Sequence, residues 1–150
     1  MADFSLVELN ATNIVAANGL TLRPGQEQFV TPTSYAIADT YVNPLTSWPR
    51  VVLDGDHVVG FIRGNFEPDH PQLEFRSCIW RINVAADAQG SGVGTFAVKG
   101  LADEARRRGN KQLTVIWEPG EKGPEEFFLR QGFTITGQTQ YGENIGSLQL

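Results

Sequence analysis

The sequence predicts an α/β (α+β) fold, and three observations support that prediction. Strand-like and helix-like patterns follow one another in the order β-α-α-β-β-β-α-β-α-β-β. An apolar stretch that ends at Val84 leads into a glycine-rich turn, and a helical pattern begins directly after the turn. The chain has 150 residues of ordinary globular composition. We therefore expect a single domain over residues 1–150.

The first half of the chain is expected to contain two helices and four strands. Residues 4–9 alternate apolar and polar side chains, which is the pattern of a half-buried strand. Thr12 and Asn13 can cap a short helix, and Pro44 should end the next one. Gly55, between two aspartates, is typical of a hairpin turn. The expected elements are strands 4–9, 50–53, 57–66 and 73–84, a helix over 14–17, and a helix capped by Thr33 or Ser34 that runs to Val42.

The glycine-rich turn opens the best-defined helix of the second half. Ala97, Leu101 and Ala105 form one apolar line along it. Three arginines occupy its last turn, and Gly109 follows as a suitable end residue. Gly100 inside the helix lowers its propensity, which close packing against a sheet would explain. The remaining expected elements are strands 112–117, 133–136 and 147–150, and a short helix that Pro124 opens and Gly132 ends.

Composition and charge narrow the classes of function. The formal net charge of −5 is an argument against nucleic acid as a partner and for a cationic small substrate. Solubility alone is the alternative meaning of this charge, and the notably simpler one. No apolar run reaches the roughly 20 residues of a membrane helix, and no signal peptide is evident, so no membrane partner is expected. Cys78 is the only cysteine, which fits a reducing, cytoplasmic location. One cysteine and two histidines are too few for a zinc site, so no metal is expected.

Three glycines at positions 90, 92 and 94 predict an anion-binding turn. Glycine has no Cβ, so backbone N–H groups can approach a phosphate closely. The helix that follows adds unpaired N–H groups and a partial positive charge. The turn is not a P-loop, because no Gly-Lys-Ser/Thr follows, and its spacing differs from the G-x-G-x-x-G of dinucleotide sites.

The motif Gln89-x-x-Gly92-x-Gly94, after a strand that contains Ile82-x-Val84, resembles the acetyl-CoA signature of the GNAT N-acetyltransferase superfamily. The order of strands and helices extends this resemblance over nearly the whole chain. It implies the GNAT fold, with a mixed, mostly antiparallel central sheet that is splayed at the acetyl-CoA site and with about four helices. Shorter matches resemble the bacterial diamine and polyamine acetyltransferase branch; they lie at 26–30, 48–50, 80–81, 119–121 and 124–127.

The resemblance also implies which residues bind acetyl-CoA. The backbone of residues 82–84 would hydrogen-bond the pantetheine arm, and the N–H of Val84 would stabilise the tetrahedral oxyanion. Ile82 and Val84 can also be core residues, since a buried side chain is compatible with an exposed backbone. The expected cofactor-binding residues are Ile82, Asn83, Val84, Gln89, Gly90, Ser91, Gly92, Val93, Gly94, Thr95 and Phe128.

Two positions depart from the pattern of the family. Phe128 stands where many members have a tyrosine that protonates the leaving thiolate, and Cys78 stands where many have a glutamate base. A lone neutral thiol is a poor base, so we expect Cys78 to be inert core packing. Glu118 is then preferred over two other glutamates as the base, acting through a water molecule, and Tyr141 is the candidate acid. An aromatic lid is the alternative role for Tyr141.

Four residues are candidates for an amine-binding pocket. Tyr35, Trp48 and Trp80 could offer aromatic faces for cation–π contacts with an ammonium group. Glu27 could supply a carboxylate beside them. Ordinary core packing is the alternative for each aromatic residue.

The sequence therefore predicts an acetyl-CoA-dependent N-acetyltransferase that acts on the primary amine of a small molecule, such as a polyamine or an amine-bearing antibiotic. The amine would attack directly in a ternary complex. Two alternatives stay open. Phe128 and Cys78 motivate a non-catalytic acyl-CoA-binding regulatory domain, and an open groove would favour a peptide or protein N-acetyltransferase. A homodimer is compatible with the resemblance.

Overall fold

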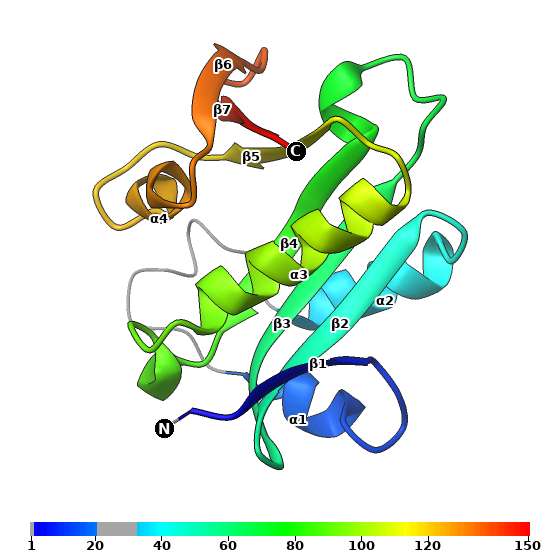
Figure 1. The fold of residues 1–150 in the computed structure, drawn as a ribbon, viewed down its shortest axis with the longest axis vertical. Helices are drawn as coiled ribbons and strands as arrows, with labels where there is room; N and C mark the ends of the chain where they lie inside the picture. The colour runs from blue at the N-terminus through cyan, green and yellow to red at the C-terminus, as the bar shows by residue number, and fades with distance from the viewer. Residues whose placement is uncertain (1, 21–32) are drawn as a thin grey trace.

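The computed structural model describes residues 2–20 and 33–150, which form a central sheet with helices on both faces (Figure 1). The element order is the one expected from the sequence, with two short 3₁₀ turns in addition. The strands are β1 (Phe4–Glu8), β2 (Ser47–Asp54), β3 (His57–Phe66), β4 (Ser77–Val84), β5 (Gln112–Trp117), β6 (Thr134–Gln138) and β7 (Asn144–Gln149). The helices are α1 (Ile14–Asn18), α2 (Thr33–Val42), α3 (Val93–Arg107) and α4 (Glu125–Arg130), and the 3₁₀ turns are η1 (Leu73–Phe75) and η2 (Ala86–Ala88).

The described strands form one mixed sheet of seven strands in the order β1-β2-β3-β4-β5-β7-β6. All neighbouring pairs are antiparallel except β4 and β5, which are parallel. A parallel pair needs a crossover connection, and α3 provides it between β4 and β5. The mixed, mostly antiparallel sheet and the four described α-helices confirm the expected fold class.

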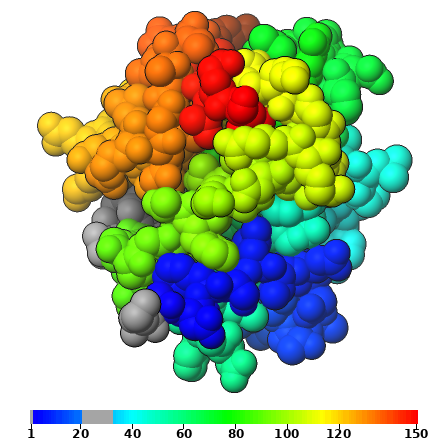
Figure 2. Space-filling model, in the orientation of Figure 1, coloured from blue at the N-terminus to red at the C-terminus, as the bar shows by residue number. Residues whose placement is uncertain are grey.

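The two faces of the sheet carry separate apolar cores. Helix α3 covers one face, where its buried side chains pack with those of β2 to β5 and with Phe128 of α4. Helices α1 and α2 cover the other face, and Phe61 of β3 packs there against Ala17 and Ile37. Gly100 of α3 lies against Leu6 of β1, whose Cδ2 would be only 2.5 Å from a Cβ at that position. The close packing expected for this glycine is therefore confirmed. Figure 2 shows α3 between the N-terminal and C-terminal segments on one surface.

Strands β4 and β5 separate soon after they meet. In the described chain they pair only through Cys78 with Thr114 and Ile79 with Val115. A bulge lies directly after this point, because Arg63 of β3 pairs with Arg81 while the next residue pairs with Ile79. Trp80 is the extra residue, and such a bulge bends its strand and increases the local twist. The sheet is thus splayed between β4 and β5, as the resemblance implied.

Several boundaries differ from those expected. Residues 73–84 are not one long strand: η1 comes first, and the hydroxyl of Thr114 donates a hydrogen bond to the carbonyl of Glu74, which helps to hold that turn. β2 and β7 both begin three residues earlier than expected, since antiparallel partners supply backbone hydrogen bonds whatever the side chains are. Pro124 caps α4 and does not occupy its first helical position.

Candidate active site

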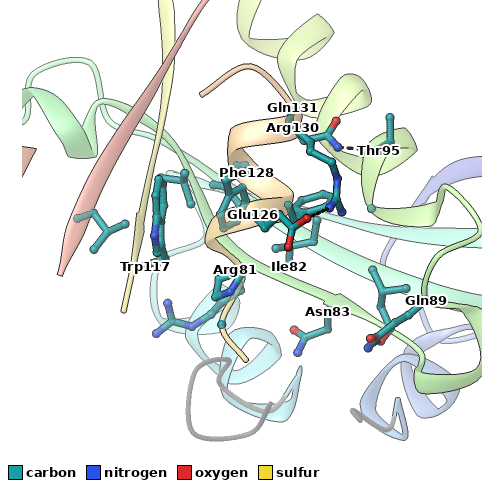
Figure 3. A pocket seen from close by; sticks show the side chains of 18 of the residues that line it. Arg81, Ile82, Asn83, Gln89, Thr95, Trp117, Glu126, Phe128, Arg130 and Gln131 are labelled. Atoms are coloured by element: carbon teal, nitrogen blue, oxygen red, sulfur yellow. Dashed lines mark hydrogen bonds and ion pairs between the residues drawn. The ribbon is translucent and has the colours of Figure 1, made fainter. Parts of the chain in front are cut away.

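A groove of about 640 Å³ opens where β4 and β5 diverge (Figure 3). One wall is the β4 segment 79–84, and the opposite wall is formed by the end of β5 and by α4 with the loop before it. The glycine turn and the first turn of α3 close one end. A volume of this size is typical of a site for a small molecule or a cofactor.

The glycine turn has the geometry of an anion site. Gly90 and Gly92 have φ angles of +84° and +95°, which residues with a Cβ rarely adopt, and Gly92 is the N-cap of α3. The side chain of Gln89 donates a hydrogen bond of 3.1 Å to the carbonyl of Val84, which ties the turn back to β4. The unpaired N–H groups of a 15-residue helix therefore begin at the groove.

Aromatic residues build the wall at α4. Phe128 is only 2% exposed, and its ring stacks on Trp117 of β5 with a centroid distance of 5.3 Å. Gln131 donates a hydrogen bond of 2.9 Å to the hydroxyl of Thr95, so α4 is joined to the first turn of α3. A Cβ at Gly94 would lie 2.8 Å from the ring of Phe127. This wall of the groove therefore depends on contact between α3 and α4, which are separated in sequence by β5.

Most of the expected cofactor residues do line this groove. They are Ile82, Asn83, Val84, Gln89, Gly90, Gly92, Gly94, Thr95 and Phe128. The other two lie elsewhere in the same segment: Ser91 is exposed, and Val93 is 1% exposed within the apolar core beneath α3. Ile82 and Val84 also pack against that core, so both roles weighed for them are compatible with the structure.

The candidate acid and base residues lie outside the described lining of the groove. Glu118 is exposed just after β5, and Tyr141 is 81% exposed in the turn between β6 and β7. Cys78 is buried between its strand partners in β3 and β5. Burial raises the pKa of the Cys78 thiol to about 12, although nearby Arg63 opposes this shift. The thiol is consequently neutral at physiological pH.

The three described candidates for an amine pocket are not brought together. Trp80 is half-buried and lines the groove. Trp48 belongs to the core on the α3 face, with the guanidinium of Arg50 4.2 Å from its ring centre, so it takes the packing role that the sequence left open. Tyr35 is exposed on α2. Glu27 lies outside the described residues.

Several groove residues have no counterpart among the sequence-based candidates. They are Arg81, Trp117, Lys122, Glu126, Arg130 and Gln131. Glu126 and Arg130 form an i,i+4 ion pair of 3.0 Å on α4, and this spacing is visible in the sequence. The sequence does not show that α4 faces the glycine turn, which depends on the splayed sheet.

No group of three metal-ligating side chains occurs within residues 2–20 and 33–150. In the same part of the chain, no helix is long and apolar enough to cross a membrane.

Comparison with known proteins identifies the family. Residues 13–133 match the model of the acetyltransferase (GNAT) family. No curated protein matches the sequence. Three similar solved structures are the ribosomal-protein-S18-alanine N-acetyltransferase of Escherichia coli, a GNAT family acetyltransferase of Elizabethkingia anophelis with acetyl-CoA bound, and Arabidopsis thaliana Naa50 in complex with the bisubstrate analogue CoA-Ac-MVNAL.

These three structures share the fold at low sequence identity. The Escherichia coli enzyme is 16% identical with a TM-score of 0.70, over 98% of this chain and 94% of that one. The Elizabethkingia protein is 15% identical with a TM-score of 0.69, over 98% of both chains. Naa50 is 18% identical with a TM-score of 0.72, over 98% of this chain and 99% of that one. Together with the family match, the splayed sheet and the glycine turn assign this chain to the GNAT family of acetyl-CoA-dependent N-acetyltransferases.

Proposed function

We propose that this enzyme transfers the acetyl group of acetyl-CoA to the primary amine of a small molecule, by direct attack in a ternary complex. The observation that carries the proposal is the groove between β4 and β5, with the glycine turn and the N-terminus of α3 at one end. This is the end that we propose binds phosphate. Its other end reaches Trp80 and Arg81, beside the bulge of β4. One groove can thus hold a phosphate at one end and bring an amine to the thioester at the other.

The groove fits the expected co-substrate. The N–H groups of the glycine turn and of the first turn of α3 bind the pyrophosphate. The backbone of residues 82–84 would hydrogen-bond the pantetheine arm, and Phe128 would line the thioester end of the groove. The ring of Phe127 fills the space where a Cβ at Gly94 would stand, so the glycine leaves room for both the helix contact and the phosphate.

The reaction balances without a metal or a covalent enzyme intermediate. The neutral amine nitrogen attacks the thioester carbonyl carbon, and the N–H of Val84 stabilises the oxyanion that forms. The C–N bond forms, the C–S bond breaks, and the sulfur leaves as a thiolate that takes a proton from solvent. The nitrogen gives its extra proton to water, and Glu118 is the proposed acceptor beyond that water.

Phe128 cannot protonate the leaving thiolate, because a phenyl ring has no exchangeable proton. We therefore propose that the thiolate departs without a side-chain acid at that position. Tyr141 is the remaining candidate donor, and its removal is among the tests below.

A thiol-release assay with acetyl-CoA tests the proposed function. The acceptor panel contains diamines, polyamines, an aminoglycoside, free amino acids and a short peptide with a free N-terminus, and calorimetry measures acetyl-CoA binding separately. We expect thiol release with at least one small amine. Binding without release over the panel would favour the regulatory domain, and release with the peptide alone would favour a peptide N-acetyltransferase.

A further inference from the structure

Two arginines lie opposite each other at the bulge of β4. Arg63 of β3 pairs with Arg81 of β4, and Phe61 pairs with Asn83 two residues further along. Directly opposed residues of an antiparallel pair point to the same face. Phe61 packs into the core beneath α1 and α2, so Arg81 and Asn83 also point to the side of the sheet that carries those helices. In Figure 3 they lie on the opposite side of the groove from Arg130 and Gln131.

The charge of Arg63 is compensated within the protein. Its side chain is only 1% exposed, and Nη2 lies 3.1 Å from Oδ2 of Asp39 on α2. The same nitrogen donates a hydrogen bond to the hydroxyl of Ser47. The guanidinium carbon lies 5.1 Å from the centre of the Trp80 ring, within the range of a cation–π contact. Arg63 therefore has a structural role: it joins α2 to the sheet and supports Trp80.

Arg81 differs from its neighbour, because it has no close counterion among the described residues. Six described arginines lie within 4 Å of a carboxylate, and Arg76 and Arg81 do not. Of these two, only Arg81 lines the groove. Its Nη1 donates a hydrogen bond of 2.8 Å to the carbonyl of Trp80, which leaves most of its donors available to a ligand.

The guanidinium of Arg81 is partly removed from water, and carboxylates lie in its surroundings. Burial lowers the pKa of Arg81 below its usual value, while the charges of Asp39 on α2 and of Glu143, just before β7, oppose that shift. A partly desolvated guanidinium is stabilised by a carboxylate that it can bind directly. The combination of an available arginine with two carboxylates at longer range suits a zwitterion better than a polycation.

We propose that the acceptor amine of this enzyme also carries a carboxylate, which Arg81 binds. The inference rests on the proposed function and narrows its substrate to amino acids and similar zwitterionic amines. The phosphates of acetyl-CoA do not account for Arg81, because their site is the glycine turn beyond Val84. Arg81 lies on the other side of residues 82–84, toward the end of the groove that admits the amine.

Pairs of acceptors that differ only in the carboxylate test this inference. Lysine is compared with 1,5-diaminopentane, and phenylalanine with 2-phenylethylamine, by the kcat/KM of thiol release. We expect the amino acid of at least one pair to exceed its decarboxylated partner about tenfold or more in the wild type. Arg81→Gln should abolish this preference, mainly through a higher KM, and Arg81→Lys should retain part of it.

Arg76→Gln is the matched control, since Arg76 also lacks an ion pair among the described residues but does not line the groove. It should leave the preference unchanged. Thermal unfolding and acetyl-CoA binding confirm that each variant is folded. If Arg81→Gln does not fold, the inference is tested by the kcat/KM ratio of amino acid to decarboxylated amine in the wild type and in Arg81→Lys. A wild-type preference for the decarboxylated amines, or a preference that survives Arg81→Gln, would overturn the inference while the acetyltransferase assignment stands. Absence of release with every acceptor would overturn the proposed function itself.

Discussion

Cys78 is a buried thiol in the middle of β4, paired with Asn65 of β3 and Thr114 of β5. We expect Cys78→Ala to cost about 1 kcal/mol of stability, as small core truncations do. The kcat per folded molecule should stay within about twofold of wild type, because a thiol whose pKa is about 12 is not a base at neutral pH. Thermal unfolding and thiol release measure the two effects, and a large loss of turnover with unchanged unfolding would show that the thiol takes part in the reaction.

The same thiol predicts a pH dependence of stability. Its ordinary pKa of 9.0 is raised to about 12 in the folded protein, so between these values the unfolded chain loses a proton that the folded chain retains. Unfolding is thereby favoured as the pH rises above about 9. The difference in unfolding free energy between wild type and Cys78→Ala should shrink over this range. A constant difference from pH 8 to pH 11 would contradict the raised pKa.

Phe128 raises the question of how the thiolate leaves. Phe128→Tyr should raise kcat only modestly, far below the roughly 100-fold or more that general acid catalysis can contribute when proton transfer is limiting. Tyr141→Phe should leave kcat within about twofold, because the Tyr141 side chain is 81% exposed and lies outside the groove lining. Single-turnover kinetics at saturating acetyl-CoA measure both variants. Activity in Phe128→Tyr but not in the wild type would show that the wild-type protein binds acetyl-CoA without catalysing acetyl transfer.

At the scale of elements, we propose that the glycine turn and α3 together form the phosphate site. Gly92→Asp should weaken acetyl-CoA binding by tenfold or more, about 1.4 kcal/mol, because it places a carboxylate at the helix N-terminus. Gly109→Asp is the matched control: Gly109 has a φ of +87°, a substituent there meets nothing within 4 Å, and it lies at the far end of α3. Calorimetry measures the affinity of both variants for acetyl-CoA, and equal affinities would show that the glycine turn does not bind the phosphates.

One carboxylate of α4 accepts hydrogen bonds from two strands of the sheet. Oε1 of Glu125 accepts hydrogen bonds from the indole N–H of Trp117 at 3.0 Å and from the side-chain amide of Asn144 at 2.7 Å. Glu125→Ala should cost about 1–3 kcal/mol, because it leaves these partly buried donors without an acceptor. Glu126→Ala removes only an exposed ion pair and should cost about 0.5 kcal/mol or less. Urea unfolding distinguishes them, and equal losses would show that the Glu125 bonds contribute little.

At the scale of the whole molecule, the splayed sheet joins two parts. β1–β4 and β5–β7 meet through two residue pairs, with α3 packed beneath. A ligand in the groove touches both parts and should therefore stabilise the fold as a whole. At 100 times its dissociation constant, CoA should add about 2.7 kcal/mol and raise the Tm by roughly 5–10 °C. Differential scanning fluorimetry measures the shift, and its absence in a protein that binds CoA would show that the unfolded chain binds equally well.

Other expectations for the whole molecule stay predictions. The homodimer, the cytoplasmic location and the diamine or polyamine branch are not tested by the fold. The position of Arg81 in the groove is the observation behind our proposal that the acceptor is a zwitterion and not a simple polycation.

The sequence by itself determined the local features of this protein. The order of elements, the glycine turn, the helix that follows it and the apolar line of that helix all follow from neighbouring residues and their periodicity. The family followed from the glycine motif and the order of elements. Nine of the eleven expected cofactor residues line the groove, and their role in binding acetyl-CoA stays a prediction. The break of the 73–84 segment into η1 and β4 did not follow, since a side chain of β5 helps to hold it.

Only the tertiary structure decided what faces the groove from distant parts of the chain. The single bulge residue Trp80 re-aims β4, and with it Arg81, toward the side that carries α1 and α2. The stacking of Phe128 on Trp117, and the contact of Gln131 with Thr95, need α4 to lie beside both β5 and the first turn of α3. These relations arise from strand divergence, a property of two strands that are remote in sequence. No local pattern encodes that divergence, so the sequence pointed to the proposed phosphate end of the groove, and the fold pointed to the proposed acceptor end.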